Sequence, residues 1–474
     1  MLFRLIYDDD LAQAAYLIGC QKTREAIVID PERDVDRYIE LAASHGLRIV
    51  AAAETHIHAD FLSGVRELAD RVGAKVMVSG EGGPDWQSAW VDEYPHQILR
   101  DGDVFTIGGI EFTVRHTPGH TPEHIVYVLK DVGGGADEPL GVVSGDFVFV
   151  GDLGRPDLLE TAAGIQGTTD SAAHDLASSA RGFRELPDFL QVWPAHGAGS
   201  ACGKALGAVP QSTVGYECRF NPMLGLADDE DAFVEEILSG QPEPPAYFSR
   251  MKAWNRDGVP LLKAMPNVPE LGGDEIDSML GDDLRIIDLR SWNDHRAGHL
   301  PGSLWMPAGG MFLGGVGSYV EPEDRVMLVV EPDKVDRFVR ALVRIGLDKV
   351  VGYVTPETLA ACGLPMAQAP EVTAEEMRAL LEEDSSPAVL DVRRATEWDA
   401  GHIDPATNIA HTRIIPRLDE VPSEGPLLVH CAGGIRSAMA ASELRRRGID
   451  AINVAGGWNA MRKAGIESAA ADPA

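Results

Sequence analysis

Apolar and polar positions alternate along the first 200 residues in a pattern that predicts a mixed fold rich in sheet. Short apolar runs bounded by polar residues or glycine are typical of strands, and amphipathic stretches such as Val35–His45 separate them. An α/β fold of this kind suits functional residues that are carried on loops at a sheet edge. The predicted strands are Glu25–Asp30, Leu47–Glu54, Ile110–Arg115, Ile125–Lys130 and Gly141–Ser144.

A change of composition follows this region. From about Asn221 to Leu271 the chain is rich in proline, which predicts a short helical excursion and then a linker. Beyond it the sequence repeats itself as strand, acidic turn, loop, strand, helix and strand, which predicts two copies of one small α/β domain with a mainly parallel sheet. The matching segments are Arg285–Arg290 and Ala388–Arg393, Gly298–Ser303 and Gly401–Asp404, and Val326–Val330 and Leu427–His430.

Composition and charge exclude several classes of protein. The 474 residues suffice for about three domains, and an apolar content of 45% argues against disorder. A net charge of −33 repels phosphate, so neither nucleic acid nor an anionic membrane is an expected partner. We expect a cytoplasmic protein, because no apolar run is long enough for a membrane span and the start does not resemble a signal peptide. The five cysteines are scattered, which predicts neither a disulfide framework nor a structural zinc site.

Potential metal ligands follow several of the predicted strands. An HxHxD pattern comes directly after the apolar segment RIVAAAE, and further histidine and aspartate residues end later strands. Any one of these residues alone is more often structural than ligating. Several nitrogen and oxygen donors at strand-to-loop junctions together predict a metal site. The six candidates are His56, His58, Asp60, His120, Asp146 and His196.

This pattern resembles the metallo-β-lactamase superfamily over residues 1–220. The resemblance implies an αββα sandwich that gathers these loops at one edge. The family's full motif is HxHxDH, and its sixth residue helps to build a second metal site. Here that residue is Phe61, whose ring cannot ligate a metal. A second site would keep Asp60, His196 and a shared Asp146, which is poor support for a second tightly held metal.

Within the superfamily, the segments THIHAD, PGHTP, SGD and GRPD are similar to those of persulfide dioxygenases. The resemblance implies one Fe(II) per chain, with zinc as the alternative metal. The implied ligands are two histidines and one carboxylate, a set that leaves open positions for a persulfide and O₂. These ligands would be His56, His120 and Asp146. The remaining candidates would orient ligands or water around them, namely His58, Asp60 and His196.

Two further features concern the substrate. Arg155, in GDLGRPDL, matches an arginine that lies at the thiol-substrate pocket of that family, where a guanidinium can pair with a substrate carboxylate or phosphate. The alternative interpretation of Arg155 is a surface ion pair. After His196 the chain reads GAGSACGK, where glutathione-type enzymes carry an aromatic residue, so the identity of the carrier thiol stays open.

A second chemical motif surrounds Cys431, in LLVHCAGGIRSAM. An apolar strand, a loop with two glycines and an amphipathic helix place backbone N–H groups, a helix N-terminus and Arg436 around the sulfur, which stabilises an anionic persulfide. With LDVR and GHI before it, this segment resembles the rhodanese family. The loop is shorter than that of phosphatases built on the same fold, which favours sulfur over phosphate. The loop residues are Ala432, Gly433, Gly434 and Ile435, and the resemblance implies that Asp391 and Arg393 brace them.

The first copy of the repeat lacks this motif. Glu331 stands where Cys431 stands in the second copy, and a carboxylate cannot carry a persulfide, so we expect an inactive rhodanese-like domain. Cys362 near its end is interpreted as packing, and the glycine-rich segment Gly309–Gly317 as a plain loop. The expected domains are residues 1–250 (metal domain with a helical extension), 272–362 (inactive copy) and 370–470 (active rhodanese domain).

Three functions are consistent with these motifs. The leading one is a persulfide dioxygenase that converts a small thiol persulfide and O₂ to sulfite and thiol, coupled to a sulfurtransferase that gives or uses thiosulfate. The second is a zinc thioesterase of the hydroxyacylglutathione hydrolase type, although Phe61 disrupts the second metal site that it needs. The third is a non-enzymatic scaffold, which the intact CAGGIR segment disfavours. A homo-oligomer is left open.

Overall fold

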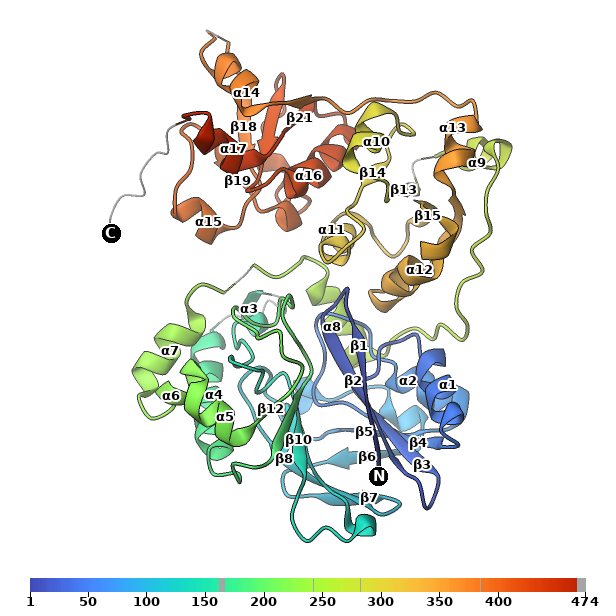
Figure 1. The fold of residues 1–474 in the computed structure, drawn as a ribbon, viewed down its shortest axis with the longest axis vertical. Helices are drawn as coiled ribbons and strands as arrows, with labels where there is room; N and C mark the ends of the chain where they lie inside the picture. Colours follow the sequence, from blue (N-terminus) through green and yellow to red (C-terminus); the bar gives the residue numbers. More distant parts are fainter. Residues whose placement is uncertain (162–166, 242, 282, 384, 467–474) are drawn as a thin grey trace. The chain divides into compact units, whose positions relative to one another are not determined.

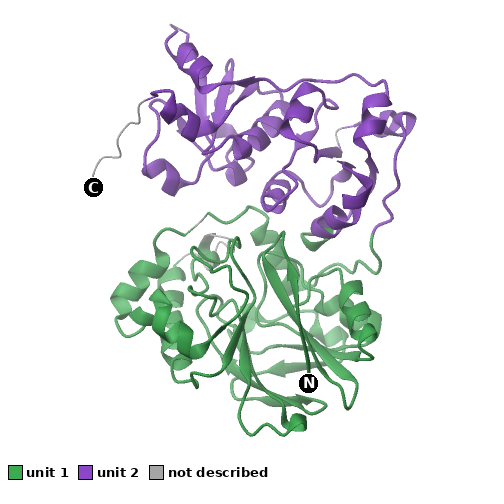
Figure 2. Ribbon diagram, in the orientation of Figure 1, with its two compact units in different colours: residues 1–265, 343–345 green, residues 266–342, 346–474 purple. Residues whose placement is uncertain are grey.

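The structure is a computed structural model that describes residues 1–161, 167–241, 243–281, 283–383 and 385–466. The chain forms two compact units, one of residues 1–265 and 343–345 and the other of residues 266–342 and 346–474 (Figure 2). Among the described residues, no helix combines the length and the apolar character needed to cross a bilayer.

The first unit contains two six-stranded sheets. The first sheet pairs its strands in sequence order, antiparallel from β1 to β3 and parallel from β3 to β6. Its strands are β1 (Leu2–Asp8), β2 (Gln13–Cys20), β3 (Glu25–Ile29), β4 (Arg48–Ala53), β5 (Lys75–Ser79) and β6 (His96–Leu99). The second sheet has the order β12-β11-β10-β9-β8-β7 and consists of β7 (Val104–Ile107), β8 (Ile110–His116), β9 (Ile125–Lys130), β10 (Gly141–Gly145), β11 (Gln191–Pro194) and β12 (Ser212–Thr213).

Helices surround the two sheets, and several of them cover the outer faces (Figure 1). They are α1 (Asp36–Ser44), α2 (Val65–Val72), α3 (Leu158–Thr161), α4 (Thr169–Phe183), α5 (Val214–Phe220), α6 (Pro222–Leu226), α7 (Glu230–Leu238) and α8 (Phe248–Asp257). Apolar residues from both sheets, such as Tyr16 and Phe112, form one core between them, and separate cores join each sheet to its helices. The expected αββα sandwich is confirmed, and each of the five predicted strands ends within one residue of the observed one.

The proline-rich region contains more regular structure than the sequence indicated. Helices α6, α7 and α8 all lie within residues 221–271, and α8 is a helix with a buried face, not linker. Phe248 and Met251 are buried there, as are Lys252 and Asn255. Burial of this face outweighs the low helix content that the surrounding prolines predict. Residues 258–269, which follow α8, form neither helix nor strand.

The second unit contains two all-parallel sheets, one in each copy of the repeat. The first has the order β14-β13-β15-β16, with β13 (Leu284–Asp288), β14 (Leu304–Trp305), β15 (Arg325–Val329) and β16 (Val350–Val354). The second has the order β17-β21-β20-β18-β19, with β17 (Glu371–Val372), β18 (Ala388–Asp391), β19 (Thr407–Asn408), β20 (Leu427–His430) and β21 (Ala451–Val454). The predicted parallel α/β architecture of both copies is confirmed.

Helices flank each of these sheets. Those of the first copy are α9 (Gly273–Met279), α10 (Trp292–Ala297), α11 (Phe312–Tyr319), α12 (Val335–Arg344) and α13 (Pro356–Ala361). Those of the second are α14 (Ala374–Leu381), α15 (Ala395–Asp399), α16 (Ile435–Arg446) and α17 (Gly457–Lys463). The expectation of a plain loop at Gly309–Gly317 is wrong from Phe312 onward, because α11 begins there. Phe312, Val316 and Tyr319 are buried on it, and this burial outweighs the poor helix propensity of glycine.

The expected domain boundaries stay a prediction. Residues 467–470, at the end of the expected active rhodanese domain, lie outside the described residues.

Candidate metal centre and sulfur-transfer loop

All six predicted ligands lie on loops that follow strands of the two sheets. His56, His58 and Asp60 follow β4, and His120 lies between β8 and β9. Asp146 follows β10 directly, and His196 lies just beyond the parallel strand β11. The sandwich therefore brings residues from distant parts of the sequence to one place, as the α/β pattern predicts.

His56, His120 and Asp146 form a buried cluster whose ligand atoms all lie within 4.8 Å of one another. The Nε2 atoms of His56 and His120 lie 4.0 and 3.6 Å from Oδ2 of Asp146. Their Nδ1 atoms are engaged elsewhere: that of His56 lies 3.0 Å from Oγ1 of Thr55, and that of His120 is 2.9 Å from the carbonyl oxygen of Arg155. Each ring is thus oriented with Nε2 toward the carboxylate.

The chemistry of this donor set fits a metal cation. Neither carboxylate oxygen of Asp146 makes a hydrogen bond of ordinary geometry with a described residue, although the side chain is buried. Burial lowers the pKa of His120 to about 4 and that of His56 well below its ordinary value, so both imidazoles are neutral. Burial alone would raise the pKa of Asp146, but His196 and His56 hold it well below the usual range. Two neutral imidazoles and one carboxylate are the ligand forms that a divalent metal requires.

The remaining three candidates lie around this cluster in two different settings. His58 is engaged with the first sheet: its Nε2 lies 3.1 Å from Oδ1 of Asp30, and its ring packs against Phe61 in a tilted arrangement with centroids 4.4 Å apart. His196 instead faces inward, with Nε2 3.4 Å from both Oδ2 of Asp60 and Oδ1 of Asp146. The motif HxHxD therefore serves two purposes, since His58 braces the first sheet through Asp30 while Asp60 borders the cluster.

Arg155 has a fully buried side chain. Its guanidinium donates to both carboxylate oxygens of Asp157, at 2.7 and 2.5 Å, and to the carbonyl oxygen of Ala201 at 3.1 Å. Its own carbonyl oxygen orients His120. The ion pair with Asp157 is partly buried, because the side chain of Asp157 is 15% exposed, and the substrate-binding role of Arg155 stays a prediction.

Helix α8 supplies contacts to the ligand loop that the sequence did not indicate. The side-chain amide of Asn255 donates to the carbonyl oxygens of His58 and Phe61, both at 2.8 Å, and its oxygen accepts from the N–H of Ser63 at 2.9 Å. Nζ of Lys252 lies 3.9 Å from the ring centroid of Trp86. The one signal for this contact was the amphipathic run FSRMKAWN, which the flanking prolines obscured.

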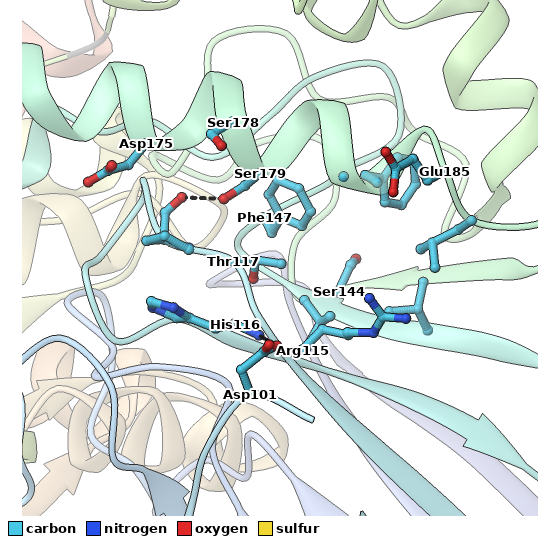
Figure 3. Close-up of a pocket in the computed structure, with 16 residues that line it drawn as sticks. Asp101, Arg115, His116, Thr117, Ser144, Phe147, Asp175, Ser178, Ser179 and Glu185 are labelled. Carbon is cyan, nitrogen blue, oxygen red and sulfur yellow. Dashed lines mark hydrogen bonds between the residues drawn. The ribbon is translucent and has the colours of Figure 1, made fainter. Parts of the chain in front are cut away.

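The loop that carries His120 is anchored at both ends. Oγ of Ser179, on α4, donates to the carbonyl oxygen of Pro118 at 2.7 Å, and Nε2 of His116 lies 2.8 Å from that of Pro122. A cavity of about 310 Å³ lies between α4 and the strands β8 and β10, lined by His116, Thr117 and Ser179 among others (Figure 3). The hydrogen bonds position His120 without filling this cavity.

Cys431 lies at the C-terminal end of β20 and is buried. Its Sγ accepts a hydrogen bond from the N–H of Gly434 at 3.1 Å and lies 3.5 Å from Oγ of Ser437. Gly434 has φ of 95°, a left-handed conformation that glycine adopts without strain and that turns its N–H toward the sulfur. Helix α16 begins at the next residue, so its N-terminus faces the same sulfur.

Two ion pairs flank the sulfur loop. Arg436 donates to both carboxylate oxygens of Glu397, at 2.6 and 2.8 Å. Arg393 likewise donates to both carboxylate oxygens of Asp391, at 3.0 Å to Oδ1 and 2.6 Å to Oδ2, and its guanidinium carbon lies 4.6 Å from the ring centroid of Trp458. The backbone N–H of Trp458 in turn donates to the carbonyl oxygen of Cys431 at 2.6 Å. Asp391 and Arg393 are therefore linked to the loop through Trp458.

The comparable position in the first copy has a different backbone. Glu331 is exposed and precedes a 3₁₀ turn at Pro332–Lys334, where Pro332 has no N–H to donate. A cavity of about 450 Å³ lies here, lined by Arg290, Glu331 and Lys334 among others.

Comparison with known proteins agrees with this geometry. The family profile described as the metallo-beta-lactamase superfamily matches residues 8–196, and that of the rhodanese-like domain matches residues 373–464. The 2.1 Å crystal structure of a metallo-beta-lactamase from Staphylococcus aureus subsp. aureus COL is 39% identical to the chain, covers 75% of it and 99% of its own length, and superposes with a TM-score of 0.68. The chain belongs to the metallo-beta-lactamase superfamily.

Two curated relatives of this metallo-beta-lactamase superfamily protein differ in their named activities. The mitochondrial persulfide dioxygenase ETHE1 of Bos taurus is 27% identical over 263 residues, which cover 55% of the chain and 89% of the relative. The hydroxyacylglutathione hydrolase of Tolumonas auensis is 33% identical over 186 residues, which cover 39% of the chain and 62% of the relative. The chain thus joins a metallo-beta-lactamase domain with persulfide dioxygenase homology to a C-terminal rhodanese-like domain.

Proposed function

We propose that this protein is a non-haem iron persulfide dioxygenase with a rhodanese-type sulfurtransferase on the same chain. The observation that carries the proposal is the buried set of His56, His120 and Asp146, two neutral imidazoles and one carboxylate with their ligand atoms within 4.8 Å. This is the facial-triad donor set of non-haem Fe(II) oxygenases, which keep open positions for substrate and O₂. The homology to persulfide dioxygenases supports persulfide as the substrate.

The overall reaction follows from the oxidation states of sulfur and oxygen. A thiol persulfide, O₂ and water give the free thiol, sulfite and two protons, and the sulfane sulfur loses the four electrons that O₂ gains. When bound, the iron would supply a Lewis-acidic redox centre at which persulfide and O₂ meet. The protein orients the two Nε2 atoms through Thr55 and the Arg155 carbonyl, and buries the site so that bulk water is kept out.

The sulfur-transfer step would take place at Cys431. Its thiolate attacks the sulfane sulfur of a persulfide, the donor thiolate leaves, and Cys431 carries the persulfide. Sulfite then attacks the outer sulfur, the S–S bond to Cys431 breaks, and thiosulfate and the Cys431 thiolate are formed. The Gly434 N–H, the N-terminus of α16 and Arg436 stabilise the anionic sulfur in both steps. The sulfite made at the iron is therefore an acceptor for the persulfide on Cys431.

A zinc thioesterase is the second candidate function, supported by the 33% identity to a hydroxyacylglutathione hydrolase. The two candidates differ in metal and in reaction. Anaerobically purified protein with about one iron per chain supports the dioxygenase, and zinc-loaded protein that hydrolyses a glutathione thioester supports the hydrolase.

Removal of single ligands tests the proposal. His56→Ala, His120→Ala and Asp146→Ala should each abolish iron retention and persulfide-dependent O₂ uptake, since a three-ligand site has no spare donor. His174→Ala is the matched control, because the side chain of His174 is 41% exposed and its Nδ1 lies 2.7 Å from Oε1 of Glu230, away from the metal cluster in sequence. Ordinary O₂ uptake by any of the three ligand variants would remove that residue from the assignment.

A further inference from the structure

A histidine lies at the same sheet edge as Cys431. His411 begins a 3₁₀ turn, His411–Arg413, that follows β19. Its N–H donates to the carbonyl oxygen of Val392 at 3.1 Å, and the N–H of Val392 donates to that of His430 at 2.9 Å. His411, Val392 and Cys431 therefore form one row, just past the ends of β19, β18 and β20. Ligands of parallel α/β sheets bind outside the carboxyl ends of the strands, where this row lies.

The row places His411 within side-chain reach of the sulfur loop. Neighbouring strands are about 4.8 Å apart, so the backbones of His411 and Cys431, two strands apart, are separated by about 10 Å. The 3₁₀ turn packs against α16, the helix whose N-terminus faces the sulfur. The hydroxyl of Tyr319, on α11, donates to the carbonyl oxygen of His411 at 2.9 Å. This contact fixes the turn beside the loop.

The imidazole of His411 is a neutral hydrogen-bond donor. Burial, together with the charges of Arg436 and Arg394, lowers the pKa of His411 to about 3. Its Nδ1 is buried and has no hydrogen-bond partner among the described residues, although the side chain as a whole is partly exposed. We therefore assign the single proton of the neutral ring to Nε2, since Nδ1 has no acceptor for it.

Arg394 adds positive charge to this edge. Arg436 is already paired with Glu397, whereas the guanidinium of Arg394 is exposed and forms no ion pair with any described residue. An oxyanion bound beside the imidazole would therefore meet a positive charge that no carboxylate neutralises. Hydrogen bonds and ion pairs to an oxyanion are stronger than those between neutral groups.

The first copy of the repeat lacks both groups. The pairing of β14 with β13 and of β19 with β18 gives the two copies the same register. Counted from that pairing, Ala308 stands in place of His411, and Ser291 stands in place of Arg394. The imidazole and the unpaired arginine therefore accompany the thiol of Cys431, and the fold itself does not require them.

We propose that His411 and Arg394 bind the oxygen atoms of the oxyanion that accepts sulfur from Cys431, with sulfite as the acceptor. Nε2–H of His411 donates to one oxygen, and the guanidinium of Arg394 pairs with the negative charge. The sulfur lone pair of sulfite then attacks the outer sulfur of the persulfide. The new S–S bond forms as the bond to Cys431 breaks, and the electron pair stays on the Cys431 thiolate. This inference rests on the proposed function and names the acceptor subsite.

Anaerobic assays of the full-length chain separate the two half-reactions, because the iron site cannot oxidise persulfide without O₂. Glutathione persulfide loads Cys431, seen as the mass of one added sulfur on its peptide, and sulfite then releases thiosulfate. His411→Leu and Arg394→Ala should load Cys431 as the parent chain does. The sulfite concentration that gives the half-maximal rate should rise at least about tenfold in each, the loss expected for a hydrogen bond to a charged group.

Two further variants distinguish a hydrogen-bond donor from mere packing. His411→Gln restores an N–H donor and should recover most of the parent response to sulfite, whereas His411→Leu supplies apolar volume alone. Arg417→Ala is the matched control for the loss of an arginine, because Arg417 pairs with Glu420 and both side chains are more than 40% exposed. It should keep the parent response.

A second measurement does not depend on sulfur transfer. Inorganic sulfate, an unreactive oxyanion, should slow the alkylation of resting Cys431 by iodoacetamide, followed on the peptide that contains it. His411→Leu should need roughly tenfold more sulfate for the same protection.

Two results would overturn the inference. One is the parent response to sulfite in both His411→Leu and Arg394→Ala. The other is sulfate protection of Cys431 that is equal, or equally absent, in the parent chain and His411→Leu. A parent chain whose Cys431 accepts no sulfur would instead contradict the proposed function, and the sulfate measurement would still decide the inference.

Discussion

The two copies of the repeat in the second unit share one buried brace and differ in the loop beside it. In each copy an aspartate at the end of a central strand pairs with the arginine two residues later, Asp288 with Arg290 and Asp391 with Arg393. In each copy that arginine also donates to a glycine carbonyl, at 2.8 and 2.9 Å. Yet only the second copy places a thiol beside an N–H-lined turn. The brace therefore belongs to the fold, and the proposed chemistry belongs to the loop.

The largest effect should come from Cys431→Ser, which makes the second copy resemble the first. Thiosulfate formation should be abolished, because serine carries no sulfane sulfur. Persulfide oxidation to sulfite should be largely intact, since the proposed iron ligands belong to the other unit. Both activities are measured in one assay, in which the protein is given persulfide and O₂ and the amounts of sulfite and thiosulfate formed are compared. Loss of O₂ consumption as complete as in His120→Ala would contradict the two-site scheme, and Cys431 would then deliver persulfide to the iron.

Much of this comparison could be predicted from the sequence, because it rests on local signals. RIIDLR and AVLDVR are apolar strands followed by a fixed acidic turn, and CAGGIR combines a nucleophile with the residues that shape its loop. The ligands of the candidate metal centre could also be predicted from local signals, since each follows a predicted strand.

Features that depend on packing were not predictable in this way. The glycine-rich segment of α11 is helical because Phe312 and Val316 become buried, which no local propensity indicates. Asn255 reaches the ligand loop only because α8 packs against that loop in the folded first unit. Cys202 approaches Asp60 only in the folded sandwich. Contacts between residues far apart in sequence have no periodic signal from which to be inferred.

A second, smaller effect should follow from removing the shared brace. Asp391 is fully buried and the side chain of Arg393 is 3% exposed, so Asp391→Asn leaves a buried guanidinium without its counter-charge and should cost about 3–5 kcal/mol. Asp288→Asn should cost less, because Arg290 is 14% exposed and water can solvate it.

Hydrogen exchange measured on peptides from β18 and β20, and separately on peptides from β13 and β15, reports each copy by itself. The surface variant Asp419→Asn is the control. Equal losses of hydrogen-exchange protection in the two copies would show that the exposure of the arginine does not determine how much stability the substitution removes.

The stability of the second copy should also depend on pH through the Glu397–Arg436 pair, an effect smaller than that of removing the buried Asp391–Arg393 pair. Burial raises the pKa of Glu397, but the hydrogen bonds and charge of Arg436 outweigh it and hold the pKa below the ordinary value of about 4.3. The stabilisation from this pair is therefore fully present above about pH 4.3 and is lost as the pH falls through the lowered pKa. In the parent chain, the hydrogen-exchange protection of α16 should fall as the pH is lowered through this range. In Glu397→Gln this protection should change less with pH, because the titrating carboxylate is gone.

The first copy provides the control for this effect. Asp294 occupies the same third position of its helix, α10, as Glu397 does in α15, but it accepts a hydrogen bond from Oγ of Ser291. Asp294→Asn should leave the acid behaviour of α16 unchanged. An identical acid profile for Glu397→Gln and the parent chain would show that the pair does not contribute.

The smallest effect is expected at Glu331, the residue that stands in place of Cys431. Its side chain is exposed, so Glu331→Ala should change neither persulfide oxidation nor thiosulfate formation. Glu331→Cys sharpens the comparison: it restores a thiol but not the donors, because Pro332 has no N–H and a 3₁₀ turn replaces the glycine-lined loop. In a Cys431→Ser background, Glu331→Cys should therefore yield no thiosulfate above that of Cys431→Ser alone. If it did restore transfer, a thiol at the end of the strand would suffice, and the N–H-lined loop would not be what separates the two copies.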